Sequence, residues 1–131
     1  MITINPWINF NGNAEEAFTF YKSVFGGEFT KVIRFKDLAN SEFTVAEKDQ
    51  NKIMLIALPI GKSNVLMAND VPEIMGQVNE NENRSKISIT TESKEEADRL
   101  FNGLFAGGKI EGQTGGFYIG KWDGRTGMVY N

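Results

Sequence analysis

Hydrophobic and polar residues alternate in a short stretch near the start of the chain. Ile4, Pro6, Ile8 and Phe10 occupy every second position, and asparagines and a tryptophan fill the positions between them. Neighbouring side chains on a β-strand point to opposite faces, so this period of two predicts a strand with one apolar face. We expect Ile4, Ile8 and Phe10 to pack against a helix.

Two amphipathic helices are predicted, one in each half of the chain, because apolar residues there recur three and four positions apart. Each helix would begin after a residue that caps its free amides, carry a glutamate three positions later, and end at a pair of glycines. These residues are Asn13, Glu16 and Gly26-Gly27 in the first half, and Ser93, Glu96 and Gly107-Gly108 in the second. Chance similarity between two helices would explain the apolar spacing but not the matching ends.

The segments around the two helices predict the same order of elements in each half. An alternating stretch at residues 86–90 precedes the second helix, as residues 4–11 precede the first. Three β-rich stretches follow each helix: residues 29–35, 52–60 and 64–69 in the first half, and residues 109–113, 117–122 and 127–130 in the second. We therefore predict a single α+β domain of two βαβββ modules, at about residues 1–75 and 85–131. The polar segment at about 76–84 would link them, and residues 36–51 would be irregular with a short helical turn.

Composition narrows the classes of function. The 131 residues are enough for one domain. The 14 Lys and Arg against 17 Asp and Glu, with a pI near 5.0, disfavour a nucleic-acid partner or an anionic membrane. The chain has no Cys and no His, which excludes disulfide scaffolds, zinc fingers and His-dependent catalytic triads. Any metal ion would need oxygen ligands.

Two further features concern the location of the protein in the cell. The longest apolar runs, such as residues 53–60, are far too short to cross a bilayer. The first residues lack the basic region of a secretion signal. We expect a cytoplasmic protein with no membrane partner.

The alternating strands also predict where polar side chains gather. If Ile8 and Phe10 face a helix, Asn5, Trp7 and Asn9 must face the other way. The same argument places Lys86, Ser88 and Thr90 on the corresponding face of the second module. Buried polar groups cost free energy unless they are paired or hydrated. These faces therefore indicate either a hydrated pocket or simply a sheet surface covered by water.

Several stretches of the chain resemble the PhnB-like branch of the vicinal oxygen chelate superfamily, which includes glyoxalase I, extradiol dioxygenases and bleomycin-resistance proteins. The resemblance runs from residue 2 to about 111, and it implies an open half-barrel with helices outside and a cavity inside. Proteins with such a fold are often homodimers. The stretches are Asn5-Pro6-Trp7-Ile8-Asn9-Phe10-Asn11-Gly12, residues 16–18 and 20–27, Lys52-Ile53-Met54, Asn64-Val65-Leu66-Met67-Ala68 and residues 91–97.

The superfamily's metal enzymes hold a divalent ion with four strand positions, typically His and Glu. This chain departs from that pattern: the resemblance implies that Asn5, Leu55 and Lys86 stand at three of these positions, and no carboxylate lies at the fourth, between residues 127 and 131. We predict no metal and no cofactor. Members of the branch have also been described as 3-demethylubiquinone 3-methyltransferases, whose cofactor commonly needs a Gly-rich turn after the first strand. Only Gly12 follows that strand here.

Other motifs in the chain have more than one explanation. Residues 103–109 have the spacing of a phosphate-binding loop, but they would end a helix rather than begin one, so a glycine cap explains them. Lys86 and Glu111 form either a pair inside the cavity or an ordinary hydrated ion pair. Trp7 either stacks on a planar ligand or fills the barrel.

The prediction is a homodimer that binds a small molecule in the half-barrel cavity without a metal. The expected ligand-binding residues are Asn5, Trp7, Asn9, Met67, Lys86, Ser88 and Gln113. One alternative is a metal-dependent lyase, isomerase or dioxygenase with a rebuilt oxygen site, for which Glu111 and Asp123 are the acidic candidates. A second alternative is a degenerate structural dimer.

Overall fold

The computed structural model describes residues 1–38, 45–80, 86–106, 109–114, 117–122 and 125–130, with only the backbone described for Lys86 and from residue 109 onward. The chain divides into two compact units, Met1–Val78 and Asn79–Asn131. Their boundary falls within the polar segment at residues 76–84.

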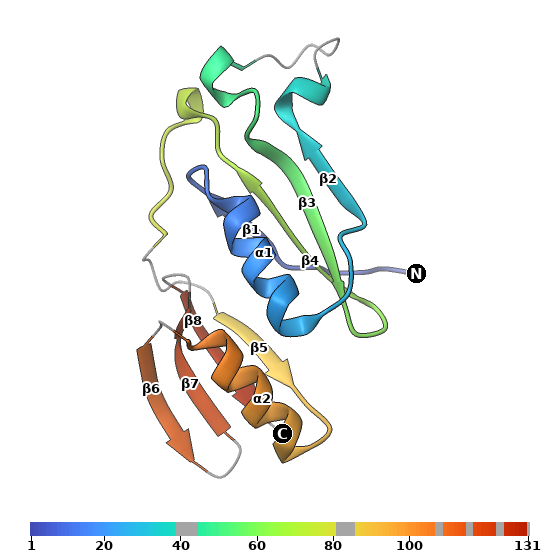
Figure 1. Cartoon of the computed structure of the whole chain (residues 1–131), viewed down its shortest axis with the longest axis vertical. Coiled ribbons are helices and arrows are strands. Elements are labelled where there is room, and N and C mark those ends of the chain that lie inside the picture. Colours follow the sequence, from blue (N-terminus) through green and yellow to red (C-terminus); the bar gives the residue numbers. More distant parts are fainter. Residues whose placement is uncertain (39–44, 81–85, 107–108, 115–116, 123–124, 131) are drawn as a thin grey trace. The chain divides into compact units, whose positions relative to one another are not determined.

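The first unit is one four-stranded sheet with one α-helix (Figure 1). Its elements are β1 (Trp7–Phe10), α1 (Ala14–Phe25), β2 (Lys31–Arg34), β3 (Ile53–Ile60) and β4 (Asn64–Asp70), with short 3-10 turns η1 (Phe35–Leu38), η2 (Glu47–Asp49) and η3 (Glu73–Met75). The strand order is β1-β4-β3-β2, and only the β1–β4 pair is parallel. The predicted strands and the helical turn are confirmed.

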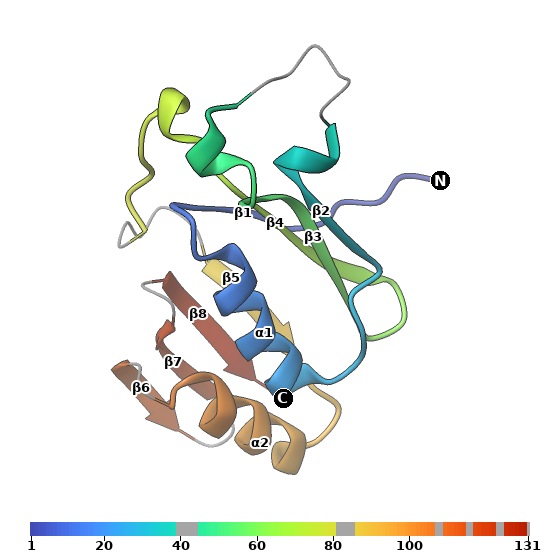
Figure 2. The same ribbon diagram turned by 45° about the horizontal axis from the view of Figure 1, so that its top comes forward.

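The second unit repeats this arrangement. Its elements are β5 (Lys86–Thr90), α2 (Lys94–Leu104), β6 (Lys109–Thr114), β7 (Phe117–Trp122) and β8 (Arg125–Tyr130). The strand order is β5-β8-β7-β6, again with one parallel pair, between β5 and β8. The predicted duplication of a βαβββ module is therefore confirmed at the level of sheet topology. Figure 2 shows each helix lying along one face of its own sheet.

The core of the first unit lies between α1 and one face of the sheet. Phe18 and Tyr21 of α1 are fully buried, and their rings contact each other edge-on at 5.4 Å. Phe10 of β1 meets Phe18 at 6.2 Å in the same edge-to-face geometry, which aromatic pairs prefer. The strands add Ile8, Ile56, Leu58, Leu66 and Ala68, all buried. Each large side chain buried here contributes about 1.5–3 kcal/mol, so this face holds the helix to the sheet.

The expected packing of Ile4 is wrong. Ile4 is 91% exposed, and β1 begins only at Trp7. Before β1, Met67 N of β4 donates to Pro6 O at 3.1 Å, and Val65 N donates to the side-chain Oδ1 of Asn5 at 3.2 Å rather than to a backbone carbonyl. Ile4 thus lies beyond the last paired residue and has no sheet under it.

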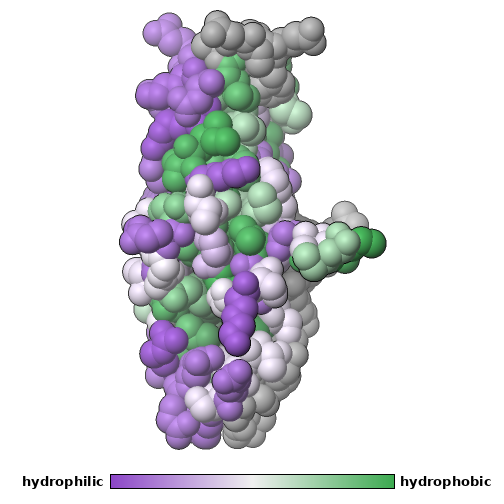
Figure 3. Space-filling model, turned by 90° about the vertical axis from the view of Figure 1, so that its right-hand side faces the viewer, coloured by the Kyte–Doolittle hydropathy of each residue, from purple (hydrophilic) through white to green (hydrophobic). Residues whose placement is uncertain are grey.

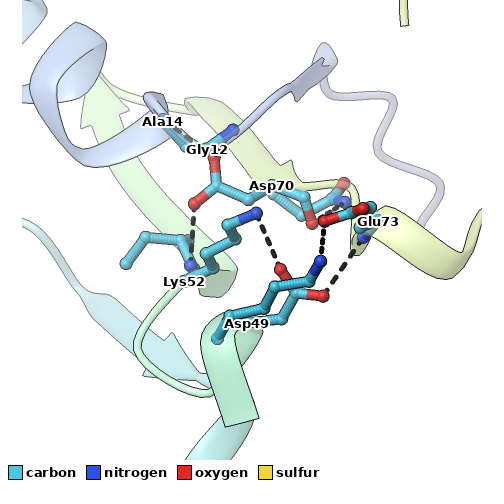
Figure 4. A network of polar contacts seen from close by, with 9 residues as sticks. Gly12, Ala14, Asp49, Lys52, Asp70 and Glu73 are labelled. Carbon is cyan, nitrogen blue, oxygen red and sulfur yellow. Dashed lines mark hydrogen bonds and ion pairs between the residues drawn. The ribbon is translucent and has the colours of Figure 1, made fainter. Parts of the chain in front are cut away.

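The expected N-cap of the first helix is also wrong in its chemistry. Asn13 precedes α1, but its backbone (φ −112°, ψ 21°) is not extended and its side chain caps nothing. The buried carboxylate of Asp70 takes this role: its Oδ1 accepts from Gly12 N at 3.0 Å and from Ala14 N at 2.9 Å (Figure 4). Its Oδ2 accepts from Ile53 N at 2.8 Å. One side chain therefore joins the ends of β1 and β4, the start of α1 and the start of β3.

The remaining helix ends behave as predicted where the structure describes them. Ser93 is extended (φ −144°, ψ 156°) and its hydroxyl accepts from Glu96 N, which confirms the cap of α2. Gly26 ends α1 with φ 80°, a conformation that favours glycine. The pair Gly107-Gly108 lies outside the described residues.

A side-chain clamp holds the last residue of the first unit. Asn11 donates through Nδ2 to Val78 O at 2.7 Å, and its Oδ1 accepts from Val78 N at 2.8 Å. The carboxamide thus pairs with the backbone as a neighbouring strand would. The point at which the chain leaves the first unit is tied directly to the turn between β1 and α1.

Asp70→Asn is expected to lower the free energy of unfolding by about 2–4 kcal/mol, because a carboxylate that accepts from three backbone amides, in two buried hydrogen bonds and one part-buried, loses its charge and one acceptor. The matched control is Asn13→Ala, which removes the residue that the sequence marks as the cap. This substitution is expected to lower the free energy of unfolding by less than about 0.5 kcal/mol, whereas the loss of a working N-cap lowers it by about 1 kcal/mol. Urea unfolding followed by circular dichroism measures both, and equal losses would contradict the assignment of the cap to Asp70.

Candidate functional site

The face of the first sheet that points away from α1 carries three of the seven candidate residues, Trp7, Asn9 and Met67. Strand parity and register place ten side chains on this surface, which we call the open face. They are Trp7 and Asn9 of β1, Val65, Met67 and Asn69 of β4, Leu55, Ala57 and Pro59 of β3, and Lys31 and Ile33 of β2. The open face is apolar along its middle strands and polar near β1.

Trp7 is the largest side chain on this face, and it is held in place. The side chain is 50% exposed, while its Nε1 donates to Oδ1 of Asn69. Asn69 in turn donates through Nδ2 to Asp70 O at 3.0 Å. The indole N–H is therefore already paired, and what Trp7 offers to another molecule is the face of its ring. An aromatic ring whose orientation is set in advance loses little entropy when it stacks.

Asn69 was not predicted from the sequence. It comes from the last positions of β4, 62 residues from Trp7 along the chain, and no local pattern reveals that the two meet. The contact between Trp7 and Asn69 follows only from the parallel pairing of β1 with β4. This pairing places Asn9 beside Asn69 and Trp7 beside Met67. Met67 itself is half-buried next to Trp7, and Asn9 is exposed. The structure thus brings Trp7, Asn9 and Met67 together on one face.

Asn5 has a different position. It precedes β1, is half-buried, and its Oδ1 accepts from Val65 N. The carboxamide oxygen therefore continues the ladder between the strands. A ligand could still use the Nδ2 group of Asn5 and the second lone pair of its Oδ1.

The other predicted ligand-binding residues belong to the second unit. Lys86 and Ser88 lie on β5, in register with Thr126 and Met128, and the side chain of Ser88 is exposed. Gln113 lies on β6 in register with Tyr118. Because β5 and β6 are the two edges of that sheet, it does not bring Gln113 beside Lys86 or Ser88.

The two acidic candidates of the alternative enzyme are also in the second unit. Glu111 lies on β6, where the register with β7 shifts between Ile110 and Gly112. Lys86 is on β5, at the opposite edge, so the sheet does not make Lys86 and Glu111 neighbours. Asp123 lies outside the described residues.

A cluster of charged side chains around Asp49 lies beside the turn between β1 and α1 (Figure 4). Asp49 is buried, its Oδ1 lies 2.7 Å from Lys52 Nζ, and its Oδ2 accepts from Glu73 N at 3.2 Å. Glu73 forms an ion pair with Lys48. The hydrogen bond from Lys52 and that from the Glu73 backbone lower the pKa of Asp49, although burial opposes the shift. The carboxylates are engaged by the protein itself, so this cluster holds loops together.

The donor chemistry of the open face does not fit a divalent ion. Leu55, at one of the positions that the superfamily uses for ligands, has no donor atom, and the oxygen of Asn5 is engaged by the backbone. In the described part of the chain, no three acidic groups gather closely enough to hold a metal ion. These residues therefore do not supply the ligands of the superfamily's four-ligand metal centre.

Similar solved structures define the class of protein. A fosfomycin resistance protein, FosX, from Listeria monocytogenes is 11% identical with a TM-score of 0.62, covering 99% of this chain and 91% of that one. A PhnB protein from Bacillus cereus, described as a putative 3-demethylubiquinone-9 3-methyltransferase, is 20% identical with a TM-score of 0.71, covering 98% of each chain. The fold is that of the glyoxalase/bleomycin-resistance proteins.

The family is narrower than this class. Protein PA1353 from Pseudomonas aeruginosa is 32% identical with a TM-score of 0.77, covering 99% of this chain and 97% of that one. The family described as 3-demethylubiquinone-9 3-methyltransferase matches residues 2–123. The chain belongs to this family, in its PhnB-like branch. Among curated proteins, none matches the chain significantly. Neither described α-helix has the length and hydrophobicity of a membrane span.

The lowered pKa of Asp49 predicts a change in stability at acid pH. A carboxyl whose pKa is lower in the folded state than the usual value of about 3.9 stabilises the fold above that value. This contribution is lost as the pH falls through the lower, folded pKa. Asp49→Asn removes it at every pH, so the difference in urea midpoint between the wild type and Asp49→Asn should be largest near neutrality and shrink in strong acid.

The matched control for this series is Asn13→Ala, which removes an exposed side chain that carries no titratable group. Its difference from the wild type should stay nearly constant across the same pH range. A difference for Asp49→Asn that does not depend on pH would show that Lys52 does not shift the titration of Asp49.

Proposed function

We propose that this protein binds a small molecule on the open face, in the half-barrel cavity that its fold family forms, without the superfamily's metal ion. The observation that carries the proposal is the Trp7 ring, which is half-exposed and oriented by Asn69. A flat aromatic surface fixed beside polar groups is typical of small-molecule sites. Of the predicted ligand-binding residues, Trp7, Asn9 and Met67 supply the contacts on the open face, with Asn5 just before β1. Lys86, Ser88 and Gln113, in the second unit, stay predictions from the sequence.

Structural similarity to metal enzymes does not by itself support a metal-dependent reaction here. One FosX structure, at 10% identity, is described in complex with Mn(II) and a dihydroxypropylphosphonic acid. That complex is a property of FosX. In this chain Leu55 makes the corresponding strand apolar on the open face, which favours binding of a ligand over coordination of an ion.

Methyl transfer, which the family's description names, has little support in the arrangement around Gly12. Gly12 has φ 113° and its N–H already donates to Asp70. It is therefore not available to bind the phosphate or carboxylate of a nucleotide-like cofactor, as glycine-rich turns do. The sheet is mixed, with only one parallel pair, and not the parallel sheet on which such turns are found.

We further propose that the active form is a homodimer in the cytoplasm. The support is the N-terminal segment, which extends away from its sheet in Figure 1 and ends in hydrophobic atoms in Figure 3. Met1, Ile2 and Ile4 are almost fully exposed. A second copy of the chain would bury these side chains, as symmetric dimers commonly bury exposed apolar segments.

Mass spectrometry of small molecules that copurify with the native protein is the direct test, followed by thermal shift with each molecule found. The wild type should be stabilised by the ligand, and Trp7→Ala should lose at least tenfold in affinity because it removes the stacking surface. Asn69→Leu should weaken binding less, since it frees the ring without removing it. Trp122→Phe, in the second unit, serves as the matched control for loss of a tryptophan.

Three results would contradict the proposal. Equal ligand affinity in Trp7→Ala and the wild type would exclude the open face as the binding site. Tight, stoichiometric binding of manganese, nickel or zinc in a calorimetric titration would favour the metal-dependent enzyme instead. A protein that dimerises but is stabilised by no copurified molecule would favour the degenerate structural dimer.

A further inference from the structure

Four residues of the open face form one straight row across the first sheet. Trp7 is in register with Met67, Met67 with Ala57, and Ala57 with Lys31. Residues in register on neighbouring strands point to the same side of a sheet. The row thus runs from one edge strand, β1, to the other, β2, and carries a different chemical group at each end.

The length of the row follows from the spacing of strands. Neighbouring strands lie about 4.7–4.9 Å apart, so the backbone positions of Trp7 and Lys31 are separated by roughly 14 Å. Between them lie a thioether and a methyl group, from Met67 and Ala57. Ala57 is buried by its neighbours, and Met67 is half-buried. The middle of the row is therefore an apolar floor without polar groups to satisfy.

Lys31 supplies the charge of this row. Its side chain is exposed, and within the described residues it forms no ion pair. The nearest charged neighbours along the chain are already compensated: Arg34 pairs with Glu15 at 2.7 Å, and Glu28 with Lys22 at 2.9 Å. None of the ten residues of the open face is an Asp or a Glu. The only formal charge on that face is positive.

From this row we infer that the ligand is a planar aromatic molecule that carries an anionic group, with its ring on Trp7 and its anion toward Lys31. The inference rests on the proposed function and names the ligand's chemical class. A tryptophan face also attracts cations, but Lys31 would repel a cationic ligand and no carboxylate of the open face would hold it. Nε1 of Trp7 already donates to Asn69. Lys31 is therefore the polar group of the row that is left to recognise the ligand.

The test uses the full chain with Trp122→Phe, so that a single 5-fluorotryptophan at position 7 reports binding by its fluorine chemical shift. The probes are biphenyl-4-carboxylate, biphenyl-4-carboxamide and (biphenyl-4-yl)methylammonium. The carboxylate should bind more tightly than the carboxamide, and the ammonium most weakly. Lys31→Gln should weaken the carboxylate about two- to fivefold, the range for an exposed ion pair, and leave the carboxamide unchanged.

Lys62→Gln is the matched control, because Lys62 is an exposed lysine in the turn between β3 and β4 and its loss changes the net charge equally. It should leave all three probes unaffected, and high salt should abolish the advantage of the carboxylate. Equal binding of carboxylate and carboxamide, or an equal effect of Lys62→Gln, would overturn the assignment of an anionic ligand while leaving the proposed site intact. No shift of the Trp7 signal with any probe would overturn the proposed function itself.

Discussion

The structure of the first unit depends on one buried carboxylate. Asp70 lies at the end of β4 and accepts hydrogen bonds from the turn before α1 and from the first residue of β3. Charge-assisted bonds of this kind are among the stronger polar interactions in proteins. They hold the start of α1 at one corner of the sheet, and the apolar contacts of Phe18 and Tyr21 then keep the helix on one face. The opposite face is left to Trp7 and its neighbours.

This division of the sheet explains why the same strands serve two purposes. On one side, Ile8 and Phe10 build the core; on the other, Trp7 and Asn9 are exposed or half-exposed. Asp70 and Asn69 are adjacent on β4, and their side chains point to opposite faces. Asp70 secures the helix, while Asn69 orients the Trp7 ring. The stability of the unit and the geometry of its candidate site are therefore linked through neighbouring residues of a single strand.

The order of elements could be predicted from the sequence because it rests on local periodicity. Strands, helices and the glycine end of α1 follow from patterns of a few residues, and the duplication follows from comparing the two halves. The contacts of Asp70 with the start of α1, and of Asn69 with Trp7, could not be predicted, because they join residues 56 to 62 positions apart. Ile4 was misplaced since alternation alone does not show where a ladder ends. The row from Trp7 to Lys31 needs the register of all four strands, which the sequence does not reveal.

The central claim is that the open face of the first sheet, and not the charged cluster around Asp49, is the binding surface. The most direct measurement is a titration of the isotopically labelled wild-type protein with biphenyl-4-carboxylate, followed by amide chemical shifts. The account predicts saturable shifts that are largest at Trp7, Met67, Ala57 and Lys31 and small along α1. Shifts centred on Asp49 and η3, or no saturable shift at all, would contradict it.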